Sequence, residues 1–147
     1  MTPAATDPVT LPIESLVPHR NRMLLVDEIL ELNDQQATTL SVVKPDWPLF
    51  AAGAVEPLIA IELVAQTAGI HNGLERHKQK RSAETANGWL VGVKQAVFHV
   101  AAIALNARIT TTARNAHVYE NLREIAGTAF IDEELVAEVT LQVMEAK

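Results

Sequence analysis

Hydrophobic and polar residues alternate with a period of two along most of the chain, except in one central segment that has a helical period. Residues 24–32 and 37–44 alternate in this way, and the turn formers Asn33-Asp34 lie between them, so the pattern predicts a β-hairpin. Four more strands, rich in Val, Ile and Thr, are predicted at residues 89–100, 104–113, 125–131 and 135–143. No crossover helix separates these four strands, which argues against a parallel array and predicts an antiparallel sheet of about six strands.

The central segment, residues 56–78, is predicted to form one long helix. Pro57 suits a first helical position, where its missing N–H group is not needed. The first half of the helix carries a single charge, on Glu62, and is apolar nearly all round. Such a helix is buried, so we expect an α+β fold in which the sheet wraps around the helix. The expected domain spans residues 13–147, after a flexible, proline-rich leader at residues 1–12.

Composition narrows the classes of function. A chain of 147 residues, 48% of them hydrophobic, has the size of one domain with one core. The net charge of −6 argues against nucleic acid as a partner, because phosphate binding needs clustered Lys and Arg. No apolar run is long enough to span a membrane and no signal-peptide pattern is present, so a cytoplasmic protein without a membrane partner is expected. Cysteine is absent and no His or carboxylate pair has ligand spacing, so we expect neither a metal site nor another cofactor.

A stripe of polar and small residues interrupts the apolar surface of the predicted helix. At 100° per residue, Glu62, Gln66, Gly69 and Gly73 fall on one narrow line. The two glycines indicate a close approach of a backbone or a ligand, since each costs about 1 kcal/mol relative to alanine. The stripe is either a solvent-facing edge of the helix or a cleft containing a buried carboxyl group. In a cleft, desolvation would raise the pKa of Glu62 and suit it to proton transfer.

Four stretches of the chain also resemble the motifs of a known family. They are PHRNRMLLVD at 18–27, ELVAQTAG at 62–69, WLVGVKQAVF at 89–98 and GTAFIDEELVAEVTL at 127–141. In this order, over nearly the whole chain after Leu11, they resemble the hot-dog-fold 3-hydroxyacyl-ACP dehydratases of fatty acid synthesis. The run IELVAQ at 61–66 also resembles the diverged dehydratase-like proteins of aryl polyene gene clusters. The resemblance implies a hot-dog fold and a dimer that forms one continuous sheet through strand 89–98.

The resemblance also implies roles for individual residues. In the family, a histidine on the loop before the helix removes the α-proton of the substrate, and an acid on the helix protonates the departing β-hydroxyl group. Glu62 occupies the position of the acid, whereas Pro48 occupies that of the histidine, and residues 47–57 contain no histidine. The chain departs from the family again at Glu56-Pro57, in place of Pro-Gly, and at residues 101–105, in place of a Pro-Gly-Asp turn.

The implied substrate is a 3-hydroxyacyl thioester of acyl carrier protein or of CoA. Gln66 is expected to act beside Glu62 as a catalytic residue. The residues expected to line the substrate site are Leu58, Gly69, Val91 and Gly92, and those expected to contact a partner protein are Arg20 and Arg22. Glu62 is expected at the end of a narrow apolar tunnel near the subunit boundary, as an acyl chain requires.

Other histidines are candidates for the missing base. His71 lies nine residues after the acid, about 180° round the helix, so the two cannot converge within one subunit. His77 suits the C-terminal end of the helix, and His99 and His117 lie on predicted strands. His19 is the most plausible substitute, either as a surrogate base or as a residue that organises the start of the first strand.

Three functions fit the sequence. The first is a dehydratase in which Glu62 works with a displaced base or with one supplied by a partner. The second is a hot-dog thioesterase, in which the helix carboxylate activates water and no histidine is needed. The third is a catalytically weak subunit that supports an active homologue. A homodimer, a higher oligomer of dimers or a hetero-oligomer with a homologue is expected accordingly.

Overall fold

The computed structural model describes residues 12–16, 23–78 and 88–145 of the chain. Most of the predicted leader, residues 1–11, lies outside this part, as do His19, Arg20 and Arg22. Within the described part, no helix is long and apolar enough to cross a membrane.

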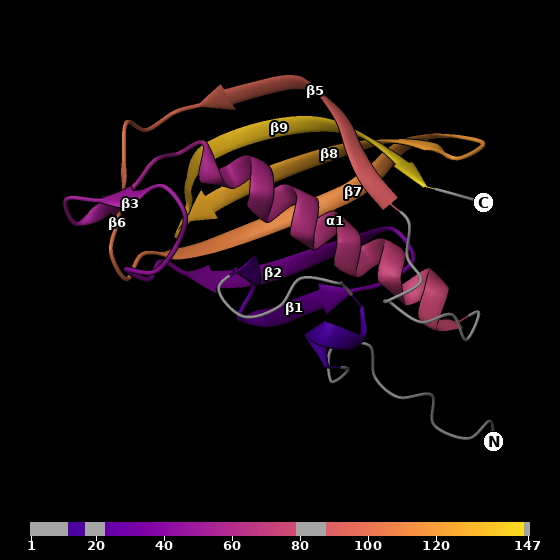
Figure 1. The fold of residues 1–147 in the computed structure, drawn as a ribbon, viewed down its shortest axis with the longest axis horizontal. Coiled ribbons are helices and arrows are strands. Elements are labelled where there is room, and N and C mark those ends of the chain that lie inside the picture. Colours follow the sequence, from indigo (N-terminus) through magenta and orange to yellow (C-terminus); the bar gives the residue numbers. More distant parts are fainter. Residues whose placement is uncertain (1–11, 17–22, 79–87, 146–147) are drawn as a thin grey trace.

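A six-stranded antiparallel sheet curves around one long helix in the described part of the chain (Figure 1). The helix, α1, spans Ile59–Lys78. The strand order is β1-β2-β7-β8-β9-β5, with bounds Glu28–Leu32, Gln36–Val42, Arg108–Tyr119, Leu122–Ile131, Glu134–Glu145 and Gly88–Phe98. The predicted α+β architecture, with its sheet of about six strands around a central helix, is confirmed.

Several predicted boundaries need correction. Residues 24–27 lie before β1 rather than in it. Strand β7 starts at Arg108 and continues to Tyr119, beyond the predicted end, because its polar last third still pairs with β8 as the hairpin projects. The predicted hairpin turn is confirmed: the Oδ1 atom of Asn33 accepts hydrogen bonds from the backbone N–H groups of Gln35 and Gln36, at 2.8 and 3.0 Å.

The core lies between α1 and the inner face of the sheet. Alternate residues of β7, β8 and β9 point toward the helix, and they include Ile109, Ile125 and Leu141, all fully buried. Val43, which follows β2 directly, is fully buried in the same core. The helix packs most closely on β7 and β2.

Polar contacts also cross the interface between α1 and the sheet. A buried hydrogen bond of 2.8 Å joins the hydroxyl groups of Thr39 on β2 and Thr67 on α1. Oδ1 of Asn72 on α1 accepts hydrogen bonds from Asn115 on β7 and Arg123 on β8, at 3.0 and 2.5 Å. These bonds help to fix the rotation of the helix on the sheet.

The helix lies against β8 at Gly127, where no side chain fits. A Cβ atom at this position would lie 2.6 Å from Cγ2 and 3.1 Å from Cβ of the fully buried Val64. We therefore expect Gly127→Ala to lower the free energy of unfolding by about 1–3 kcal/mol through overpacking. Urea denaturation followed by circular dichroism measures this change.

Gly92→Ala on β5 is the matched control, because its Cβ atom would meet only Oε1 of Gln142, at an ordinary 3.6 Å. Val64→Ala should relieve the Gly127→Ala clash, so the double variant should be more stable than the sum of the single losses predicts. Strict additivity would contradict the proposed contact.

A second, three-stranded sheet was not predicted. It consists of β3 (Phe50–Ala51), β4 (Ala54–Val55) and β6 (Ile103–Ala104), in the order β3-β4-β6. The β3–β4 turn has positive φ at Ala52 (53°) and Gly53 (81°), as a tight two-residue hairpin requires. The two stretches in which the sequence departs from the dehydratase pattern, before the helix and at 101–105, are thus hydrogen-bonded neighbours.

Strand β5 is an edge of the main sheet, since it pairs with β9 and ends the strand order. The register with β9 shifts between Leu90 and Gly92 and again between Val93 and Gln95. Such irregularities bend and twist an edge strand. The side chains of Val91 and Val93 on this edge are 48% and 43% exposed, which is a large apolar exposure for a free edge.

Candidate active site

Glu62 lies in the first turn of α1, and its side chain is half-buried. The helix begins with a tight turn, in which the N–H groups of Ile59 and Ala60 donate to the carbonyl groups of Glu56 and Pro57, at 3.0 and 2.9 Å. The predicted start at residue 56 is therefore three residues early, although Glu56 and Pro57 do form the lead-in turn. Because Glu62 is neither fully buried nor fully exposed, the stripe is not simply a solvent-exposed edge of the helix.

Gln66, one turn further along α1, is fully buried and connects three groups. Its Oε1 atom accepts a hydrogen bond of 2.9 Å from the backbone N–H of Leu25. Its Nε2 atom donates to the carbonyl oxygen of Met23 at 2.5 Å and to Oε1 of Glu62 at 3.0 Å. The side chain of Gln66 therefore joins the acid on the helix to the backbone of residues 23–25.

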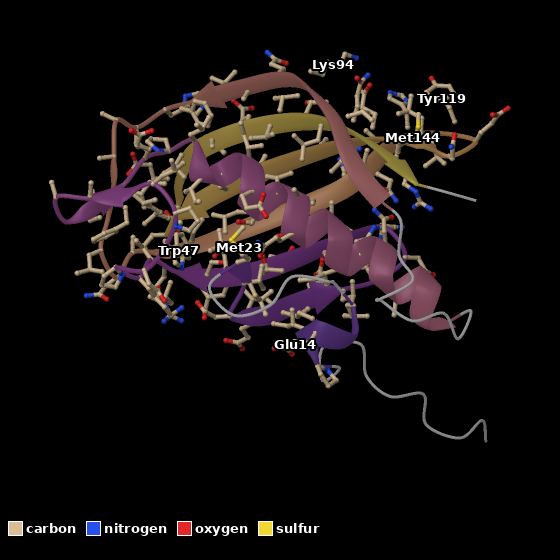
Figure 2. The ribbon with its side chains drawn as sticks, in the orientation of Figure 1. Glu14, Met23, Trp47, Lys94, Tyr119 and Met144 are labelled. Carbon is tan, nitrogen blue, oxygen red and sulfur yellow. The ribbon has the colours of Figure 1, made fainter. Side chains whose placement is uncertain are left out.

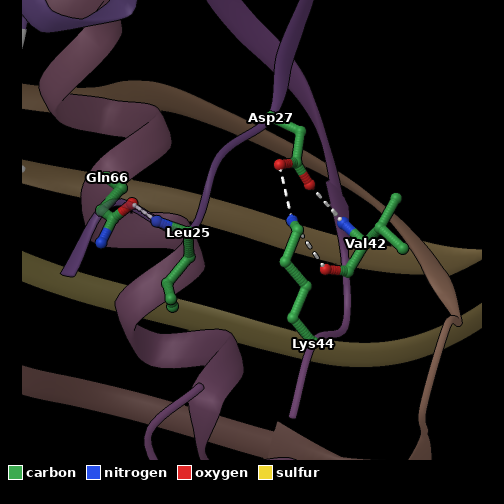
Figure 3. A network of polar contacts seen from close by, with 5 residues as sticks. All are labelled: Leu25, Asp27, Val42, Lys44 and Gln66. Atoms are coloured by element: carbon green, nitrogen blue, oxygen red, sulfur yellow. Dashed lines mark hydrogen bonds and ion pairs between the residues drawn. The ribbon is translucent and has the colours of Figure 1, made fainter. Parts of the chain in front are cut away.

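The segment that leads into β1 is also fastened at its other end, as Figure 3 shows. The carboxylate of Asp27 accepts a hydrogen bond from the N–H of Val42 at 2.8 Å and pairs with Lys44 at 2.7 Å. The exposed ion pair adds little stability, whereas the backbone bond fixes the path of the chain. Asp27, which ends the apolar run, thus has a structural role, and the run itself contacts α1 at Gln66.

Met23 places an apolar side chain at the outside of this junction. Its carbonyl group is fixed by Gln66, while its side chain is 57% exposed. Figure 2 shows Met23 beside the middle of α1. Sequence reasoning did not identify Met23 or Leu25 as neighbours of the acid, because backbone partners leave no signal in side-chain patterns.

The glycines of the helix stripe have different surroundings. A Cβ atom on Gly73 would overlap the carbonyl oxygen of Leu16, which follows the short helix η2 (Ile13–Ser15). The predicted close approach of a backbone is therefore confirmed at Gly73. Gly69, between Gln66 and Gly73 on the stripe, is half-buried, and its part in substrate binding stays a prediction.

The other predicted substrate contacts lie in two places, in the turn just before Glu62 and on the edge strand β5. Leu58 precedes α1 and is 48% exposed. Val91 and Gly92 lie on β5, at the opposite edge of the sheet from β1, whereas α1 packs most closely on β2 and β7. Their roles stay predictions, as does the apolar tunnel at Glu62.

The described histidine side chains do not supply a base beside Glu62. His71 is 5% exposed in the second half of α1, which agrees with the predicted divergence from the acid. His99, one residue beyond the end of β5, contacts Glu138 at 2.9 Å on the outer face of the sheet, away from the helix. His117 is exposed near the tip of the β7–β8 hairpin, where it stacks on Tyr119. Pro48, at the position of the family histidine, is exposed.

A hollow of about 300 Å³ lies on the outer face of the sheet. Its lining includes Thr112, Arg114, Thr128, Glu138 and Thr140, from β7, β8 and β9. The residues that alternate with these on the same strands are buried against the helix, so the hollow is on the side of the sheet away from Glu62. It is not the predicted tunnel. In the described part of the chain, no cluster of His and carboxylate side chains could hold a metal ion.

The model of the ApeP-like family, described as ApeP dehydratase, matches residues 11–147. The chain belongs to this family. The match includes every helix and strand that the structure describes in this ApeP-like chain, and it confirms the predicted resemblance to a diverged branch of the hot-dog dehydratases.

Solved structures share the fold of this ApeP-like chain. The dehydratase heterocomplex ApeI:P from Xenorhabdus doucetiae matches with a TM-score of 0.82 and 20% identity, over 93% of this chain and 92% of that chain. A sigma28-regulated virulence protein from Campylobacter jejuni matches with a TM-score of 0.69 and 14% identity, over 92% and 97%. A hypothetical thioesterase from Streptococcus pneumoniae, solved with coenzyme A, gives 0.61 and 13%, over 81% and 84%. A comparison with curated protein sequences gives no match.

Identities this low show a common hot-dog fold and leave the chemistry open. The same wrapped sheet is found in a dehydratase complex and in a hypothetical thioesterase. The reaction of the ApeP-like chain must therefore be argued from Glu62 and its surroundings.

Proposed function

We propose that this ApeP-like chain takes part in the dehydration of a 3-hydroxyacyl thioester, with Glu62 as the acid. The observation that carries the proposal is the fixed geometry of Glu62. Its half-buried carboxyl group accepts a hydrogen bond of 3.0 Å from the fully buried Gln66. A carboxyl group that is held in one orientation and partly shielded from water is suited to deliver a proton.

The proposed step conserves atoms and charge. A base removes the proton on the α-carbon, and the electron pair of that C–H bond forms the double bond between the α- and β-carbons. The bond between the β-carbon and its hydroxyl oxygen breaks, and Glu62 gives its proton to the departing oxygen. The products are a 2-enoyl thioester and water, and the proton on the base returns to Glu62 in the next cycle.

The base is proposed to come from a second, homologous subunit. Pro48 replaces the family histidine, and His71, His99 and His117 are all directed away from Glu62 or lie far along the sheet. The similar structure from X. doucetiae is by its name a heterocomplex of two proteins. A hetero-oligomer would let one subunit contribute an acid and the other a base to the same site.

The edge strand β5 is the proposed junction between subunits. Its neighbour on one side is β9, while the exposed Val91 and Val93 lie on a strand that ends the sheet. Pairing of two β5 edges would cover this apolar surface and continue the sheet across the subunits. The same junction serves a homodimer or a pair of homologues.

Thioester hydrolysis is the alternative. A helix carboxylate without a histidine can activate water, and the fold is shared with a hypothetical thioesterase that was solved with coenzyme A. A further alternative is a subunit that stabilises an active homologue without taking part in its chemistry. The proposed dehydratase and these two alternatives predict different products and a different dependence on a partner.

A mixing experiment separates them. A 3-hydroxyacyl thioester, presented on acyl carrier protein and on CoA, is incubated with this chain alone, with a homologous dehydratase subunit alone, and with both. We expect little product from this chain alone and a much larger yield of 2-enoyl thioester from the mixture, measured by mass spectrometry. Release of the free 3-hydroxy acid would favour the thioesterase instead.

Two results would contradict an active role of Glu62 in dehydration. If the homologue has the same turnover with and without this chain, or if wild-type and Glu62→Gln chains enhance it equally, Glu62 is not the acid. Copurification and sedimentation of the mixture show whether the two chains associate, independently of turnover.

A further inference from the structure

The orientation of the Gln66 side-chain amide is fixed by its neighbours. The N–H of Leu25 can only donate, so the amide atom that faces it at 2.9 Å must be the oxygen. The carbonyl oxygen of Met23 can only accept, so the amide atom that faces it at 2.5 Å must be the nitrogen. A flipped amide would place donor against donor and acceptor against acceptor, in a position where Gln66 is fully buried.

This fixed orientation constrains Glu62. The Nε2 group has two hydrogens, and the second points to Oε1 of Glu62 at 3.0 Å. An amide nitrogen cannot accept a proton in return, so Oε1 must present a lone pair to it. A carbonyl-type oxygen accepts such a bond better than the hydroxyl oxygen of a protonated carboxyl group. The proton of neutral Glu62 is therefore favoured on Oε2.

We propose that Gln66 is a positioning residue, which uses the backbone of residues 23–25 as its anchor and selects Oε2 of Glu62 as the oxygen that carries the proton. The inference rests on the proposed role of Glu62 as the acid. It also changes the predicted role of Gln66, because a fully buried amide with its hydrogens directed to Met23 and Glu62 is placed to orient the acid rather than to meet the substrate.

As a consequence, the position of the segment before β1 affects the orientation of the acid. Residues 23–25 hold Gln66, and Gln66 holds Glu62, so a shift of the segment before β1 is transmitted to the carboxyl group. Removing the amide should remove one constraint on the orientation of the Glu62 carboxyl group and weaken the preference for Oε2 as the protonated oxygen. Misplacement of a reacting group by about 1 Å can cost about 10²-fold in rate.

The test replaces Gln66 by Met, which has a similar length and no amide. In the mixture with the homologous subunit, we expect Gln66→Met to lower kcat about 10- to 100-fold with little change in KM, because the substrate is not contacted. Thr67→Val is the matched control. It removes a buried hydrogen bond of the adjacent helix residue, 2.8 Å to Thr39, that does not involve Glu62, so kcat should stay nearly unchanged.

A second measurement does not require turnover. The carboxyl carbon of Glu62, in protein labelled with 13C-glutamate and assigned by its loss in Glu62→Gln, should shift in Gln66→Met and stay in place in Thr67→Val. If Gln66→Met does not fold, the side-chain amide hydrogens of Gln66 can be observed in a Glu62→Ala variant, which has no side-chain oxygen at residue 62, so the signal of the hydrogen directed to residue 62 should move.

These readouts keep the two proposals distinct. Absence of turnover in every mixture would remove the proposed function, while the carbon signal would still decide whether Gln66 orients Glu62. An unshifted Glu62 signal in folded Gln66→Met, an unmoved amide signal in Glu62→Ala, or an equal loss of kcat in Gln66→Met and Thr67→Val would overturn the positioning role.

Discussion

Replacing Glu62 by Gln should abolish thioester turnover by the mixed subunits, with a loss of about 10²- to 10⁴-fold in kcat. The carboxamide has the size of the carboxyl group and can still accept the hydrogen bond from Gln66 through its oxygen, so the local geometry should be kept. It has no acidic proton to give to the departing oxygen. Because a half-buried charge is replaced by a neutral isostere, the free energy of unfolding should stay nearly unchanged or rise slightly.

Enzyme kinetics and thermal denaturation of the same preparations test this prediction. A large loss of stability in Glu62→Gln would assign the residue to the scaffold rather than to the chemistry. His19→Ala provides the comparison, although His19 lies outside the described residues. If His19 organises the start of the first strand, its loss should reduce stability, and activity only in proportion. A His19→Ala protein that is fully folded but inactive would make His19 the base.

Gly73→Ala should be among the most destabilising single substitutions in the chain. Its Cβ atom would overlap the carbonyl oxygen of Leu16 and lie 2.8 and 2.9 Å from the adjacent C and Cα atoms of that residue. These are backbone atoms, so no rotamer change relieves the clash. The helix itself gains up to about 1 kcal/mol from alanine, but displacement of the fully buried Leu16 side chain costs about 2–5 kcal/mol. The clash therefore wins, by about 1–4 kcal/mol in unfolding free energy.

A double-mutant cycle with Leu16→Ala checks the mechanism. In the wild-type background, Leu16→Ala should itself be destabilising, because the side chain packs with Ile70 and Leu74 in a second core cluster. In the Gly73→Ala background, the segment is already displaced, so the same substitution should cost much less. If the two losses simply add, the Leu16 backbone is not what excludes a side chain at residue 73.

Periodicity predicted the main architecture because most strands have one buried and one exposed face. The alternation in β2 and β8 and the apolar first half of α1 follow directly from the sheet that wraps around the helix. The last third of β7 was missed because Arg114, Asn115 and His117 belong to a projecting hairpin, where alternation with the core has ended. The small sheet was missed because its strands have two residues each, and these are too short to show a period.

The candidate site could be predicted only in part. Glu62 could be identified because it is the single charged residue in the apolar first half of the helix, and helical spacing placed Gln66 next to it. The partners that orient Gln66 are the carbonyl group of Met23 and the N–H of Leu25, and every residue type has these groups. The approach of Leu16 to Gly73 was visible as an unusual glycine, but the sequence did not say whether a ligand or the chain itself filled the space.

The small sheet β3-β4-β6 has a consequence for any redesign of the loop before α1. It joins the loop before α1 to residues 103–104 through paired strands, and the N–H of Leu105 donates to the carbonyl group of Gly53 at 3.0 Å. The two places where the sequence departs from the dehydratase pattern are thus joined by backbone hydrogen bonds, so a change in one alters the strand that the other pairs with. A histidine introduced at Pro48 would lie just before β3, in a loop whose hairpin pairs with residues 103–104, so we expect a graft of the dehydratase loop to require replacement of both stretches together.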